Sequence, residues 1–148
     1  MADVTFVSRR DSSFREFPPA SAHLAVVLAF YGELTVWVRK PGSAGWHLPT
    51  SGRRSRETIV EVARRELWES ARVLASRLDL LGAITQDLPK PSTGYVYMCD
   101  VQHLPWSYEL PQGVDEVGVF KVPPAQTGSE WSQTVLDHAV RARRLGLR

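Results

Sequence analysis

Two glutamates three positions apart, Glu66 and Glu69, have the spacing most suggestive of chemistry in this 148-residue sequence. Residues at this spacing lie on one face of a helix, so their carboxylates repel each other unless a cation lies between them. Oxygen-rich pairs of this kind suit Mg²⁺ or Mn²⁺, which keep water ligands and accept phosphate oxygens. The pair therefore predicts a divalent-metal site for a phosphate substrate.

The segment before these glutamates offers groups that bind anions. A loop is expected over residues 50–56, which contain three arginines, and a helix is expected from about Glu57 to Leu74 because apolar residues recur there at helical spacing. A helix N-terminus favours an anion, and arginine makes forked contacts with phosphate. Thr50, Ser51 and Arg54 are therefore candidate substrate-binding residues.

A second interpretation of the same helix involves no site. Glu66 and Glu69 would be solvated helix residues, and Glu61 would pair with Arg65 four positions later for roughly a few tenths of a kcal/mol. A Glu-x-x-Glu pair taken alone does not exclude this interpretation, so the wider spacing has to decide.

The wider spacing resembles the signature of the Nudix family. That signature runs glycine, five residues, glutamate, seven residues, Arg-Glu, an aliphatic residue, any residue, Glu-Glu, any residue, glycine and an aliphatic residue. The positions that match are Glu57, Arg65, Glu66, Leu67, Glu69 and Val73. Four specified charges at fixed spacing arise by chance at about one position in 10⁵.

Three signature positions depart from the family pattern. Ser51 stands at the first glycine, Ser70 at the second glutamate of the Glu-Glu pair, and Arg72 at the closing glycine. A serine hydroxyl is a poorer metal ligand than a carboxylate, so we expect weakened metal binding and weak hydrolysis. Arg72 disfavours a left-handed helix end, so we expect the helix to continue through Leu74.

The resemblance implies an enzyme that hydrolyses a nucleoside diphosphate linked to another moiety, with Mg²⁺ or Mn²⁺ as cofactor. It implies Glu66 and Glu69 as metal ligands, with the carbonyl of Thr50 or Ser51 as a further oxygen. Arg65 belongs with the catalytic residues in an orienting role, because it matches an outer charge of the signature that helps to hold loop and helix in place.

Two residues outside the signature complete the predicted site. Glu116 is a candidate extra metal ligand or general base, because family members often use a glutamate on a late strand or loop. Arg39 ends an expected strand just before the loop and is a candidate phosphate contact. As alternatives, Glu116 is an exposed strand charge and Arg39 a surface cation.

The order of elements favours an α+β fold, an α/β/α sandwich in which a Nudix-like mixed sheet is flanked by helices. The expected strands cover residues 4–7, 24–30, 34–38, 78–85, 95–101 and 114–122. We expect one domain over residues 1–148, with an N-terminal extension over 1–20 and a C-terminal helix over 129–145.

Composition narrows the class of protein. The hydrophobic fraction is 43% and the charged fraction 23%, as in soluble globular proteins, and one cysteine excludes an intrachain disulfide. No apolar run approaches the roughly 20 residues of a membrane span, so we expect a cytoplasmic protein without a membrane partner. The net charge of +2 does not predict a nucleic-acid partner. A homodimer is left open.

Two alternatives to an active enzyme stay open. One is a Nudix-fold module that binds nucleotides without catalysis, which Ser70 suggests. The other is an RNA-binding or interaction protein that uses the arginine loop and the cationic C-terminal tail. That tail, with Arg141, Arg143 and Arg144, either complements its own helix dipole or binds phosphate.

Overall fold

The computed structural model describes residues 4–39, 45–86, 91–104, 116–124 and 131–146, and its strands form one mixed sheet. The strand order is β1-β5-β6-β2-β3-β7, with β4 paired to β2. Only β2 and β6 run parallel among these pairs. The strands are β1 (Val4–Ser8), β2 (Leu24–Tyr31), β3 (Leu34–Arg39), β4 (Thr50–Gly52), β5 (Asp79–Gln86), β6 (Ser92–Asp100) and β7 (Glu116–Phe120).

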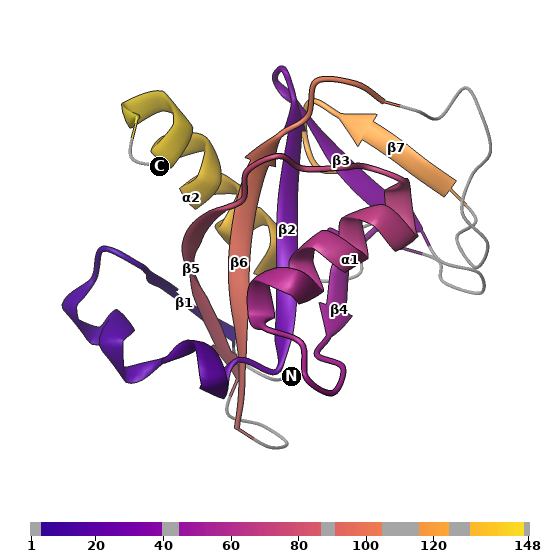
Figure 1. Cartoon of the computed structure of the whole chain (residues 1–148). Helices are drawn as coiled ribbons and strands as arrows, with labels where there is room; N and C mark the ends of the chain where they lie inside the picture. The colour runs from indigo at the N-terminus through magenta and orange to yellow at the C-terminus, as the bar shows by residue number, and fades with distance from the viewer. Residues whose placement is uncertain (1–3, 40–44, 87–90, 105–115, 125–130, 147–148) are drawn as a thin grey trace.

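Two α-helices cover opposite faces of this sheet (Figure 1). Helix α1 (Ile59–Ala71) packs on the face that includes Val27, and α2 (Trp131–Leu145) packs on the face that includes Val26 and Leu28. Successive side chains of a strand point to opposite faces, so the apolar run of β2 serves both layers. The predicted α/β/α sandwich is confirmed.

Short elements join the N-terminus to the sheet. Two 3-10 helices, Ser12–Glu16 and Pro19–Ser21, connect β1 to β2. The expected hairpin of β2 and β3 is confirmed, and Gly32 has a φ of 63° in its turn. In the described part of the chain, no helix has the length and apolar character needed to span a membrane.

The expected loop over residues 50–56 is partly wrong, because its first three residues form β4. This strand pairs antiparallel with the start of β2, in register from Val26↔Thr50 to Leu24↔Gly52. Flanking bonds extend the pairing, since the Val27 amide donates to the Pro49 carbonyl at 2.9 Å. Buried strand edges need backbone partners, and this need prevails over the low strand propensity of Thr-Ser-Gly.

The start of α1 lies two residues later than predicted. Thr58 is the N-cap, its hydroxyl accepts from the Glu61 amide at 3.3 Å, and the Glu61 carboxylate accepts from the Thr58 amide at 2.9 Å. This capping box satisfies two backbone donors at the helix start. The Thr-x-x-Glu spacing is the sequence signature of this cap.

The end of α1 also corrects a prediction, because the helix stops at Ala71 and does not continue through Leu74. Arg72 adopts a left-handed conformation, with φ 54° and ψ 34°. The next residue, Val73, is 2% exposed and donates its amide to the Leu67 carbonyl at 3.2 Å. Burying a valine side chain contributes about 1.5–3 kcal/mol, enough to offset a left-handed residue at roughly 1–2 kcal/mol.

The remaining boundaries differ little from expectation. The strand expected over residues 114–122 is observed as β7, and the C-terminal helix expected over residues 129–145 is observed as α2. Residues 105–115 and 125–130 lie outside the described residues, and the second range includes residues 129 and 130 at the start of the expected C-terminal helix.

Gly82 gives a test of how closely β1 and β5 pack. A Cβ atom at this position would lie 2.3 Å from the Val7 carbonyl oxygen and 2.7 Å from Phe6 Cζ. We expect Gly82→Ala to lower the free energy of unfolding by about 1–3 kcal/mol through overpacking. Urea denaturation measures this change. Gly52→Ala is the control, because its nearest heavy atom would be 3.9 Å away, and equal destabilisation by both variants would contradict the prediction.

Candidate active site on helix α1

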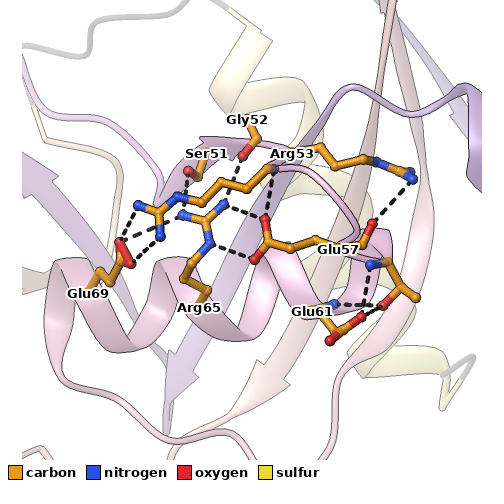
Figure 2. Close-up of polar contacts among 9 residues, drawn as sticks. Ser51, Gly52, Arg53, Glu57, Glu61, Arg65 and Glu69 are labelled. Atoms are coloured by element: carbon orange, nitrogen blue, oxygen red, sulfur yellow. Dashed lines mark hydrogen bonds and ion pairs between the residues drawn. The ribbon is translucent and has the colours of Figure 1, made fainter.

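Arg65 is the centre of the polar network on α1 (Figure 2). Its Nε donates to Glu57 Oε2 at 2.7 Å, and its Nη2 donates to Glu57 Oε1 at 2.9 Å. The two side chains are only 14% and 18% exposed. A forked, largely dehydrated pair of this kind is geometrically specific and stronger than an exposed ion pair.

The same guanidinium also contacts β4. Arg65 donates to the Ser51 hydroxyl at 3.2 Å and to the Gly52 carbonyl at 2.8 Å. Glu57 in turn accepts from the Arg54 amide at 2.8 Å. Arg65 and Glu57 therefore join β4, the following turn and α1 into one unit, as the orienting role predicted for Arg65 requires.

The electrostatics of this pair favour its charged form. Hydrogen bonds from Arg65 lower the pKa of the Glu57 carboxyl from 4.5 to about 2, and the backbone bond from Arg54 adds to the effect. The Glu57 carboxylate raises the pKa of Arg65 in return. Both groups are held ionised, so they position their neighbours and do not exchange protons near neutral pH.

Glu69 lies beside this network and contacts two cations. Arg54 donates to both carboxylate oxygens, at 3.1 and 3.3 Å, and Arg65 Nη1 lies 3.6 Å from Oε2. The Arg54 and Glu69 side chains are 63% and 42% exposed. Exposed ion pairs contribute about 0–1 kcal/mol, so another cation can replace Arg54 at Glu69 at little cost.

Glu66 differs from Glu69 because it is buried, at 4% exposed. The Ser70 hydroxyl, one helical turn later and also 4% exposed, donates a hydrogen bond to Glu66 Oε1. A buried carboxylate needs hydrogen-bond donors, and a hydroxyl supplies one where a second carboxylate would repel it. Ser70 therefore stabilises Glu66 within the protein itself.

The interpretation of these glutamates as solvated helix residues is wrong for Glu66. The predicted pairing of Glu61 with Arg65 is also wrong, since Glu61 belongs to the capping box and Arg65 pairs with Glu57. Sequence spacing on a single helix did not reveal this, because Glu57 lies before the helix and reaches Arg65 only through the fold of the turn.

The other predicted substrate-binding residues are placed differently. Ser51 contacts Arg65, while the Thr50 hydroxyl donates to the Leu48 carbonyl at 2.8 Å. Arg39 lies with its guanidinium carbon 4.9 Å from the ring centroid of Trp46, and its backbone is opposite Glu116 in the β3–β7 register. Neither Trp46 nor Glu116 belongs to the network on α1.

Arg53 is a positioning residue that the sequence did not separate from its neighbours. Its guanidinium donates to the Pro19 carbonyl at 2.6 Å and to the Glu57 carbonyl at 3.5 Å. Arg53 thereby connects the turn before α1 to the segment before β2. Three arginines in one loop gave no signal as to which of them would be used internally.

The described side chains fit a metal site that has few protein ligands and is completed by substrate. They fit a site made entirely of protein ligands less well. No group of three or more His, Cys, Asp or Glu side chains gathers within the residues that the structure describes. Mg²⁺ is commonly held by one or two carboxylates, with water and substrate phosphates as its other ligands. Glu66 and Glu69 fit such a site by number and chemistry.

Comparison with known proteins assigns this arrangement to a family. A family model described as NUDIX domain matches residues 18–138. The chain belongs to this family, and the resemblance seen in the sequence is confirmed. Members of this family generally act on phosphoric anhydrides.

Curated relatives match over a limited length. An RNA pyrophosphohydrolase of Psychrobacter cryohalolentis is 33% identical over 66 residues, which are 45% of this chain and 38% of that protein. A protein of the same name from Psychrobacter arcticus matches equally. The matched part therefore spans less than half the length of these relatives.

Solved structures share the fold at low identity. A mutant form of a Bacillus subtilis pyrophosphohydrolase has a TM-score of 0.77 and 16% identity, covering 98% of this chain and 92% of its own. A NUDIX hydrolase from Nitrosomonas europaea has a TM-score of 0.68 and 13% identity, with 82% and 90% covered. At these identities the likeness establishes the fold alone.

The Glu57–Arg65 pair predicts acid sensitivity of the folded state. Because the folded pKa of Glu57, about 2, lies below its ordinary 4.5, the pair stabilises the protein above about pH 4.5 and loses this effect as the pH falls toward 2. We expect Glu57→Gln to lower the urea midpoint at neutral pH, and the deficit relative to wild type to shrink over that acidic window.

The control for this measurement is Glu33→Gln in the exposed turn before β3. It removes the same charge without touching the network, so its midpoint should stay close to wild type throughout. A deficit of Glu57→Gln that is constant down to about pH 2 would contradict the assigned role of the charge.

Proposed function

We propose that this protein hydrolyses a phosphoric anhydride bond in a nucleoside diphosphate linked to another moiety, in a reaction that depends on Mg²⁺ or Mn²⁺. The observation that carries the proposal is the Arg65 network, which fixes β4 and the arginine turn against the part of α1 that bears Glu69. A rigid anion-binding turn beside acidic ligands is what diphosphate chemistry requires.

The proposed metal ligands are Glu66 and Glu69, with Glu116 as a further candidate ligand or general base. The bound cation would supply neutralisation of the diphosphate charge as water attacks phosphorus. The carbonyl of Thr50 or Ser51 remains a candidate oxygen ligand, although β4 pairs with β2 along these residues.

The arginines have two proposed roles: one orients the site and the others contact substrate. Arg65 is committed to Glu57 and β4, so it orients the site. The Arg54 side chain is exposed and forms a weak ion pair with Glu69, so its guanidinium can turn to a phosphate. Arg39 remains a candidate contact for a more distant part of the substrate.

The 5′ end of an RNA is the first substrate to test. The curated relatives with matching sequence are RNA pyrophosphohydrolases, and a triphosphorylated or diphosphorylated RNA end contains the anhydride bond that the proposed chemistry cleaves. This assignment concerns the substrate only, and cleavage of small nucleoside diphosphate derivatives would leave the reaction class unchanged.

A second candidate function is a nucleotide-binding module without catalysis. Two contacts favour it, because the Ser70 hydroxyl donates to Glu66 and Arg54 donates to Glu69, so groups of the protein itself already contact both carboxylates. Titration calorimetry separates the two functions. Nucleotide binding that is unaffected by removal of divalent cations supports the module, and binding that requires Mg²⁺ or Mn²⁺ supports the enzyme.

Removal of one proposed ligand gives the direct test of the enzyme. With Mn²⁺ and a panel of RNA 5′ ends and nucleoside diphosphate derivatives, we expect Glu66→Gln to lower kcat/KM by roughly 100-fold or more, because a charged ligand is lost from the reacting centre. Glu61→Gln is the matched control on the same helix, since glutamine also completes a capping box. Turnover that Glu66→Gln leaves unchanged would refute the assignment.

Replacing Ser70 restores the signature carboxylate. In the absence of metal we expect Ser70→Glu to lower the melting temperature, because it places a second buried carboxylate one turn from Glu66. Mn²⁺ should then raise the melting temperature of this variant more than that of wild type, together with its rate of hydrolysis. Equal stabilisation of both proteins by Mn²⁺ would show that position 70 does not face the metal.

A further inference from the structure

A hollow of about 250 Å³ lies between β1 and α2, on the sheet face opposite α1. Its polar and aromatic lining consists of Phe6, Ser8, Arg9, Arg10, His138 and Arg141. None of these residues takes part in the network on α1, so the hollow is separate from the candidate active site.

The floor of the hollow is built by close packing. The Phe6 ring stacks on the His138 ring, with centroids 4.3 Å apart and planes inclined by 17°. The Phe6 ring can lie across β5 because β5 has a glycine, Gly82, beneath it. A Cβ atom at Gly82 would lie 2.7 Å from Phe6 Cζ. Leu81 and Ala142 add apolar surface. The floor is therefore fixed by β1, β5 and α2 together.

The rim of the hollow is cationic, and its described lining contains no carboxylate. No carboxylate in the described part of the chain pairs with the guanidinium groups of Arg9, Arg10 or Arg141. Asp137 is in an adjoining hollow with His138 and Arg141, and its carboxylate accepts from Gln133 Nε2 at 2.7 Å. Three arginines from two elements thus face one small volume.

The arginines of the C-terminal tail either complement the dipole of α2 or bind phosphate, and Arg143 shows that they are not all alike. Arg143 pairs with Asp100, donates to the Gly32 carbonyl at 3.1 Å and lies 4.1 Å from the Phe30 ring centroid, so it is structural. Complementing the α2 dipole can account for Arg141 but not for Arg9 and Arg10, which follow β1. Arginines from separate segments that line one hollow can be bridged by a single anion.

We propose that this hollow binds a small phosphomonoester. Its phosphate would contact Arg141 and Arg9, whose forked guanidinium groups suit phosphate oxygens, and its organic part would lie on Phe6 and Leu81. The volume suits a sugar phosphate or nucleoside monophosphate, being below the range of roughly 300–1,000 Å³ typical of pockets for larger ligands. This site is independent of the hydrolysis proposed at α1.

Titration calorimetry in EDTA at low ionic strength tests the site with AMP, ribose 5-phosphate and adenosine. We expect saturable binding of both phosphate esters and none of adenosine. Arg141→Gln and Arg9→Gln should each weaken AMP binding by roughly tenfold or more, because each removes a charged hydrogen-bond donor. The amide resonances of Ser8, Arg9 and Arg10 should shift on titration with AMP.

Arg144→Gln is the matched control, because it removes the same charge from the same helix and does not line the hollow. It should change AMP affinity by no more than about twofold. Thermal unfolding confirms that each variant folds. The proposal is overturned if neither phosphate ester binds wild type, if adenosine binds as tightly as AMP, or if Arg144→Gln weakens binding as much as Arg141→Gln.

Discussion

The candidate active site depends on one guanidinium group. Arg65 holds Glu57 through two short bonds and also contacts the backbone of β4, so strand, turn and helix cannot move independently. The pair is largely shielded from water, and its mutual effect on both pKa values keeps it charged. Glu69 and Arg54, which are candidates for chemistry, lie at the exposed rim of this rigid unit. Because this unit is rigid, the exposed pair of Arg54 and Glu69 can open without disturbing the fold.

Both proposed metal ligands also contact groups of the protein itself. Ser70 donates to the buried Glu66, and Arg54 neutralises Glu69 from the turn before the helix. The two contacts differ in strength, because one is buried and the other is more than half exposed on its arginine side. Glu66 is therefore held firmly, while Glu69 is available to a competing cation. The two candidate functions therefore differ in whether a cation replaces Arg54 at Glu69.

The sheet separates two cationic regions. On one face, Arg54 of the turn pairs with Glu69 of α1, and Arg65 of α1 pairs with Glu57 of the turn. On the other, arginines from the end of β1 and from α2 surround an aromatic floor without acidic partners in the described part of the chain. The apolar run of β2 packs against both layers and keeps them apart. The candidate active site and the hollow therefore lie on opposite faces of the sheet, which α1 and α2 cover (Figure 1).

The sequence by itself determined the α/β/α architecture and the family, because alternating and helical apolar periods are local and the signature charges lie within one segment. It did not predict β4, since Thr-Ser-Gly becomes a strand only by satisfying the edge of β2. It also did not predict the left-handed Arg72, which is offset by burial of Val73. Tertiary structure alone decided that Arg65 pairs with Glu57 and not Glu61, and that Arg9 and Arg141 line the same hollow. Such pairings depend on the directions in which turns and strands bring side chains together, and spacing along a single element does not encode those directions.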